Sequence, residues 1–283
     1  MSVRLRAADS DSAPSGRSPG RFVALLVAVS IPFWIGGSIV HTELLPGLPI
    51  VYALISFCPV IAGSILVYTE SGHAGLAHFL RRAFDYRRVI DLRWYAPIFL
   101  LMPAISLLSY AWMQVKGWPL PRTQLPLPTI PAMFVGFFVG GIGEELGWTG
   151  YATEPLQSRF GAPMAAILLG AVWAGWHLVQ LFQLDHSLMW IAWWCVGTVA
   201  SRVIMVWLYT NCGRSVNAII LFHVSQNLSW QLFPNSGSHW NPRINAIILT
   251  GAVVLISAMQ HARALARGYP RTSKTPTKVG WRD

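Results

Sequence analysis

Eight segments of the chain are apolar over enough residues to cross a membrane as helices. The hydrocarbon core of a bilayer is about 30 Å thick, and a helix needs roughly 20 apolar residues to span it. Charged residues make up only 11% of the 283 residues, against the ~25% that is usual in a soluble domain. The sequence therefore predicts an all-α fold, a polytopic transmembrane bundle with spans at residues 21–40, 50–69, 94–115, 130–152, 163–182, 187–209, 216–230 and 244–260.

These spans leave room for a single membrane domain, which we place at residues 21–260. Residues 1–20 are polar and rich in Ser, Pro and Gly, a composition typical of a disordered tail. Residues 261–283 are basic and contain Pro and Thr, which predicts a flexible C-terminal tail.

The net charge of +10 follows the expected membrane topology. With the N-terminus inside, 17 of the 21 Lys and Arg residues lie in inner segments, 3 lie in outer loops, and Arg202 alone lies within a span. This asymmetry predicts that both termini are cytoplasmic. No basic face interleaved with aromatic residues is present, so the charge does not indicate nucleic-acid binding.

Residues 74–89 have a helical spacing of apolar side chains opposite a basic face. This pattern favours an amphipathic helix lying on the inner leaflet. An ordinary cytoplasmic connector is the alternative interpretation.

Two adjacent carboxylates, Glu144 and Glu145, lie inside the apolar span 130–152. A carboxylate near the bilayer centre costs at least ~2.5–3.5 kcal/mol on insertion scales, and such residues usually mark functional sites. Neighbours on a helix point about 100° apart, so one glutamate would face the site and the other would need a separate partner. Five of the six glycines in the same span lie around the glutamates and predict close helix packing.

Two of the eight histidines, His177 and His223, also lie within apolar spans, and Asn227 follows His223 by one helical turn. A carboxylate can take a proton from water, a histidine can orient that water, and imidazole and amide donors can hold an oxyanion. Counting ~1.5 Å per residue, His177 lies about 9 Å further from its cytoplasmic helix end than the other two. Glu144, His177 and His223 meet only if helices tilt or kink, or if residues 153–163 start well below the cytoplasmic ends of the other helices.

These residues fall into three blocks that resemble the type II CAAX prenyl endopeptidases, also called the CPBP or Abi family of intramembrane proteases. The first block of that family is Glu-Glu-x-x-x-Arg, which reads Glu144-Glu145-Leu146-Gly147-Trp148-Thr149 here. The second is an aromatic residue, usually Phe, three residues and His, matched by Trp173 and His177. The third is His, three residues and Asn, matched by His223 and Asn227.

The resemblance implies a multi-pass protein of the cell membrane, here a prokaryotic plasma membrane, which cleaves a peptide or lipidated-protein substrate near the cytoplasmic side. Glu144 with His177 would activate the hydrolytic water, and His223 with Asn227 would stabilise the oxyanion. Glu145 would be a supporting residue. Lipid is then the surrounding partner, and no cofactor is expected.

One position departs from the family pattern, because Thr149 stands where the motif has arginine. The glutamate pair therefore lacks its usual counter-ion. Arg202 is a candidate supporting residue at comparable depth. A simpler expectation for Arg202 is a backbone carbonyl partner, or snorkelling to the inner headgroups.

Three other functions stay open at this point. Carboxylate and imidazole are also zinc ligands, although no His-Glu-x-x-His helix or thiolate accompanies them. A transporter could use Glu and His as a proton relay, but it would predict two similar halves with broken helices, which the sequence does not contain. A catalytically impaired family member, acting as an immunity or regulatory membrane protein, would fit the loss of the motif arginine.

Overall fold

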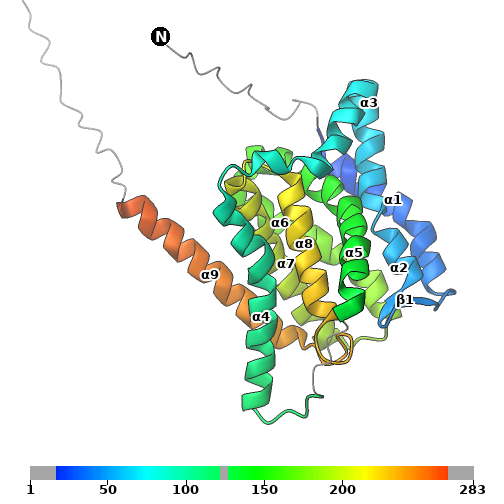
Figure 1. Cartoon of the computed structure of the whole chain (residues 1–283). Coiled ribbons are helices and arrows are strands. Elements are labelled where there is room, and N and C mark those ends of the chain that lie inside the picture. The colour runs from blue at the N-terminus through cyan, green and yellow to red at the C-terminus, as the bar shows by residue number, and fades with distance from the viewer. Residues whose placement is uncertain (1–16, 122–126, 267–283) are drawn as a thin grey trace, which may run out of the picture.

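The chain folds into a helical bundle in the computed structural model, which describes residues 17–121 and 127–266 (Figure 1). The expected tails at 1–20 and 261–283 lie almost entirely outside the described residues. The long helices and the short elements between them are α1 (Pro19–Gly37), β1 (Glu43–Leu45), β2 (Leu48–Pro49), α2 (Ile50–Ile55), α3 (Cys58–Arg81), η1 (Arg82–Phe84), η2 (Tyr86–Arg88), η3 (Leu92–Trp94), α4 (Tyr95–Val115), η4 (Leu127–Thr129), α5 (Ile130–Glu145), η5 (Leu146–Thr153), α6 (Glu154–Gln183), α7 (Leu188–Asn211), α8 (Val216–Gln231) and α9 (Pro242–Ala266).

Helix α8 is the central helix of the bundle. It packs against α4 and α5 on one side and against α7 on the other, and α7 in turn packs against α6 and α9. Figure 1 shows α8 between α4 and α5, with the far end of α9 splayed away from the other helices. Glu144-Glu145, His177, Arg202 and His223 therefore come from four helices that surround one core.

The predicted polytopic helical fold is confirmed. Among the described residues, six helical stretches are long and apolar enough to cross a membrane, and each of the eight expected spans corresponds to helical structure. Two features explain why there are six such stretches and not eight. The stretch Leu127–Gln183 contains two expected spans in one continuous helical run, and α8 has only 16 residues. The cytoplasmic location of the termini stays a prediction.

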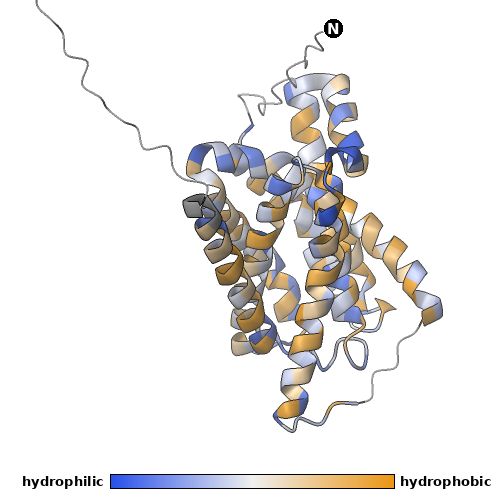
Figure 2. Cartoon of the chain, turned by 60° about the vertical axis from the view of Figure 1, so that its left-hand side comes forward, coloured by the Kyte–Doolittle hydropathy of each residue, from blue (hydrophilic) through white to orange (hydrophobic). Residues whose placement is uncertain are grey.

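Apolar side chains cover much of the outer surface, as a lipid-facing surface requires. Leu100, Leu107 and Val135 are each more than 60% exposed although they lie in the middle of long helices. Figure 2 shows hydrophobic residues along the helices and hydrophilic residues gathered at the ends of the bundle. Such a distribution matches a protein surrounded by lipid along its sides.

The expected amphipathic helix over residues 74–89 is wrong in its second half. Helix α3 ends at Arg81, and two short 3₁₀ turns, η1 and η2, follow. Phe79 and Arg82 are 1% and 8% exposed, so they pack into the protein core and do not face lipid headgroups. We call residues 82–94, which contain η1, η2 and η3, the α3–α4 connector.

A glycine interrupts α6 and divides it into two helical pieces. Gly161 has φ +75°, a backbone conformation that side chains other than glycine adopt with strain. Before the break, Glu154 accepts a hydrogen bond from Tyr209 near the end of α7. Because the break precedes Pro163, residues 163–177 belong to one continuous piece, and the change of direction at Gly161 affects the first piece, residues 154–160.

A π-helix, η5, follows the glutamate pair directly. All eight of its residues are buried. The wider turn of a π-helix is uncommon and is frequently found at functional sites. Here it joins α5 to α6 without a loop, so the residues after Glu145 remain inside the bundle.

Candidate functional site

The two glutamates end α5 at a point where the backbone of α5 lies against another helix. Gly143 and Gly147 flank the pair, and both face the start of α3. A Cβ atom on Gly143 would lie 2.6 Å from the carbonyl oxygen of Ser56, and one on Gly147 would collide with the carbonyl of Pro59. Main-chain contact therefore fixes the position of the pair, as the glycine content predicts.

Glu145 is fully buried and all its acceptor capacity is in use. Arg202 donates from Nη1 to Oε2 at 2.8 Å and from Nη2 to Oε1 at 3.0 Å. Thr149 Oγ1 donates to Oε2 at 2.5 Å, and His223 Nδ1 lies 2.9 Å from Oε1. A paired arginine fork is among the strongest partners that a carboxylate can have, so Glu145 is held rigidly.

Arg202 was expected either to pair with the glutamates or to bond a backbone carbonyl or the headgroups. In the structure it forms an ion pair with Glu145. The Arg202 side chain is 0% exposed, so it does not extend to the surface, and it makes no hydrogen bond to a backbone carbonyl in the described part of the chain. Its Nη1 also lies 3.5 Å from Thr149 Oγ1, so the threonine at the motif arginine position contacts the arginine that takes its place. The counter-ion of the pair comes from α7 instead of η5.

Glu144 has a different environment from its neighbour. Its one side-chain hydrogen bond within the described residues comes from Trp173 Nε1, which donates to Oε2 at 2.9 Å. The ring of Trp173, which makes this bond, also contacts the rings of His177 and His223. Glu144 also remains 9% exposed, whereas Glu145 is 0% exposed. Of the two carboxylates, Glu144 has free acceptor capacity.

Both histidines use Nδ1 for a fixed hydrogen bond. His177 Nδ1 lies 2.9 Å from the backbone oxygen of Trp173, and His223 Nδ1 lies 2.9 Å from the Glu145 carboxylate. Carbonyl and carboxylate oxygens only accept, so each Nδ1 carries the proton. Each ring therefore has its Nε2 available for another group.

Asn227 lies one helical turn after His223 on α8 and is half-buried. Within residues 17–121 and 127–266, its side-chain amide has no hydrogen-bond partner. The amide is therefore free to donate to a further group. All four residues expected to carry chemistry, namely Glu144, His177, His223 and Asn227, lie on the helices around this core.

Metal binding has no preassembled group of ligands in the described part of the chain. No set of three or more His, Cys, Asp and Glu side chains there is arranged to hold an ion. An apolar cavity of about 250 Å³ lies between α6, α7 and α9. None of the expected site residues lines it.

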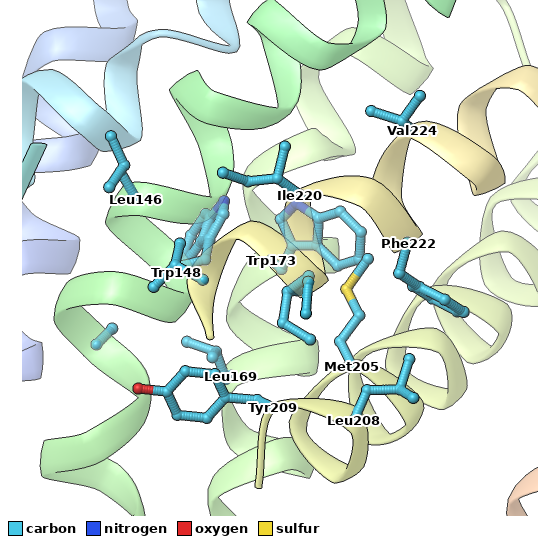
Figure 3. Packing of buried hydrophobic residues seen from close by; sticks show 14 of the residues in the cluster. Leu146, Trp148, Leu169, Trp173, Met205, Leu208, Tyr209, Ile220, Phe222 and Val224 are labelled. Atoms are coloured by element: carbon cyan, nitrogen blue, oxygen red, sulfur yellow. The ribbon is translucent and has the colours of Figure 1, made fainter. Parts of the chain in front are cut away.

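Trp173 is the site residue whose contacts the sequence did not reveal. Its ring lies 4.1 Å beneath the Arg202 guanidinium and makes edge contacts with both histidines, at 5.6 Å for His177 and 5.5 Å for His223. Figure 3 shows it at the centre of a buried cluster with side chains from η5, α6, α7 and α8. The sequence indicated that Trp173 belongs to the site only through its position at the start of the aromatic-x-x-x-His block.

Comparison with known proteins agrees with the three motif blocks. The family described as "Type II CAAX prenyl endopeptidase Rce1-like" matches residues 126–229, the region that contains every expected site residue. The protein "CAAX prenyl protease 2" of Methanococcus maripaludis is 27% identical over 229 residues, which cover 76% of this chain and 79% of that protein. The similarity thus extends well beyond the motifs.

Proposed function

The chain belongs to the type II CAAX prenyl endopeptidase family, and from this membership we propose that it is an intramembrane endopeptidase with Glu144 as its catalytic base. Glu144 would take a proton from a water molecule, and that water would attack a peptide bond of a membrane-associated substrate near the cytoplasmic side. No covalent intermediate is needed in this scheme.

The observation that carries the proposal is the unequal environment of the two glutamates. Glu145 is saturated by Arg202, Thr149 and His223 and has no exposed surface. Glu144 keeps one oxygen free and some exposed surface. A general base must reach the proton that it removes, and this requirement selects Glu144.

The histidines and Asn227 supply the other groups that hydrolysis requires. With Nδ1 bonded to a carbonyl, His177 offers the lone pair of Nε2 to orient the water. It would protonate the leaving amine only after Nε2 has received the proton that Glu144 takes from the water. His223 donates to an oxyanion from Nε2 when its ring is doubly protonated, with Glu145 as its counter-ion. The Asn227 amide would be the second oxyanion donor.

The Arg202–Glu145 ion pair supports an active enzyme over a catalytically impaired one. Loss of the motif arginine was the feature that favoured an immunity or regulatory role. Arg202 provides a positive charge to Glu145 from a different helix, α7. This ion pair therefore supports proposing an active site in spite of Thr149.

The substrate class follows from the family and from the setting. We propose a peptide or lipidated protein in the membrane of a prokaryotic cell, consistent with the name of the relative from Methanococcus maripaludis. The described residues contain no feature that selects a particular peptide sequence. Comparative proteomics of membranes containing wild-type protein or Glu144→Ala would identify an accumulating precursor.

The direct test measures peptide cleavage by purified protein in detergent. We expect Glu144→Gln, His177→Ala and His223→Ala each to lower kcat per folded molecule by 10²-fold or more, and His223→Ala also to lower Tm because it removes a buried hydrogen bond to Glu145. Glu70→Gln is the matched control, because Glu70 is exposed and bonds only to Tyr151 in the described structure. Full activity of Glu144→Gln would refute the assignment.

A chelator arm tests the metal alternative in the same preparation. We expect activity to survive chelation and elemental analysis to find no stoichiometric metal. If chelation abolished activity and added zinc restored it, the proposed mechanism would change. The attacking water would then be bound to a metal and not activated by glutamate alone.

A further inference from the structure

Trp173 connects the two glutamates, although they do not touch each other through their side chains. Arg202 is fixed by its two hydrogen bonds to Glu145, and its guanidinium lies 4.1 Å from the Trp173 ring centre. The same indole donates its N–H to Glu144 at 2.9 Å. The contacts therefore run from Glu145 to Arg202, to Trp173 and to Glu144.

We propose that Trp173 is the positioning residue of Glu144, through its indole N–H. This inference rests on the proposed function and adds to it. An aromatic ring alone satisfies the motif, and the Phe that is usual there has no donor. The tryptophan of this chain supplies an N–H that such a ring lacks.

The physical effect is orientation of the carboxylate. The plane of a glutamate carboxylate turns readily about its last side-chain bond, so one fixed acceptor bond determines where the second oxygen points. The Trp173 N–H occupies Oε2 and leaves Oε1 for water. The indole is itself held by the cation above its face, an attraction that strengthens when both groups are desolvated.

The test replaces only the donor. Genetic incorporation of 3-benzothienylalanine at position 173 exchanges the indole N–H for sulfur and keeps the ring size. We expect kcat to fall about tenfold or more, the loss associated with one hydrogen bond to a charged group, with KM unchanged. An unaltered kcat would overturn the proposal.

The matched control is the same replacement at Trp176. This residue lies on the same helix, is similarly buried at 4% exposure, and donates its indole N–H to Ser30 Oγ at 2.8 Å. We expect it to leave kcat unchanged, because its hydrogen bond ends away from the glutamates. Equal losses at both positions would mean that packing, and not the hydrogen bond, was measured.

A spectroscopic arm separates this inference from the proposed function. In ¹⁵N-indole spectra of the protein in detergent, the Trp173 N–H resonance should move upfield in Glu144→Ala and stay in place in Glu70→Ala. A resonance unmoved by Glu144→Ala refutes the hydrogen bond whether or not peptide is cleaved. Wild-type protein that cleaves nothing, with the resonance moved, refutes the proposed function alone.

Discussion

Two buried arginines hold this bundle together, and they do so in different ways. Arg202 donates both terminal nitrogens to one carboxylate, Glu145, at 2.8 and 3.0 Å. Arg82 makes its short bonds to neutral oxygens, namely the Tyr209 hydroxyl at 2.7 Å, the Arg214 carbonyl at 3.1 Å and the Gly150 carbonyl at 3.2 Å. Its nearest carboxylates are 3.8 and 4.0 Å away.

The difference shows how one type of side chain serves two purposes. Arg82 connects four parts of the chain, so its contribution is to join the α3–α4 connector to η5, to the end of α7 and to the turn before α8. Arg202 serves one carboxylate beside the candidate catalytic base. The two arginines hold the π-helix at adjacent residues, Thr149 and Gly150. Arg82 therefore belongs to the fold, and Arg202 to the site.

The largest effect should come from Arg202→Ala. Removing one partner of a buried ion pair leaves an uncompensated charge, which costs about 3–5 kcal/mol. We expect loss of stability by that amount in thermal unfolding in detergent, together with loss of peptide cleavage. Arg214→Ala is the control, because its side chain is 54% exposed and exposed pairs contribute roughly 0–1 kcal/mol.

Thr149→Arg in the Arg202→Ala background sharpens this prediction. It returns an arginine to the motif position, beside the same carboxylate, and should restore part of both stability and activity. If Arg202→Ala and Arg214→Ala are equally tolerated, the counter-ion assignment is wrong.

Arg82→Ala should have an intermediate effect of a different kind. Three hydrogen bonds to neutral acceptors are lost, at about 1 kcal/mol each, so we expect unfolding at lower temperature with kcat per folded molecule unchanged. Arg81→Ala, the exposed arginine next to it, is the control. A fall in kcat as large as that of Arg202→Ala would erase the distinction between the two arginines.

Thr149→Val should have the smallest effect. The substitution keeps the shape of the side chain and removes its hydrogen bond to Glu145, while Arg202 and His223 remain bonded. We expect a loss of about 1.5 kcal/mol and a modest fall in kcat, measured by the same unfolding and cleavage assays. No change in either quantity would show that Arg202 and His223 hold Glu145 without the threonine.

The helices and the convergence of the site were predictable because both depend on strong local signals. Long apolar runs specify spanning helices, and ionisable residues inside them indicate where the spans meet. The motif blocks indicated which of these residues belong together. Arg202 was visible as the one base inside a span.

The specific hydrogen bonds were not predictable, because they depend on helix rotation and on backbone departures from the ideal. The π-helix and the break at Gly161 change which residues face the core. Arg82 looked like part of a basic surface in the sequence, yet it is 8% exposed because the connector folds over the end of α8. There, Asp85 accepts from the backbone N–H groups of Val216 and Asn217.

The close approach of Gly143 and Gly147 to α3 bears on how this protein can be engineered. Main chain meets main chain there. In a saturation library we therefore expect Gly143 and Gly147, one helical turn apart on either side of the glutamates, to accept almost no other residue. Lipid-facing positions of α5 such as Val135, which is 61% exposed, would accept many residues. A designer seeking a new cleavage preference would therefore keep both glycines and randomise the outward faces of the neighbouring helices.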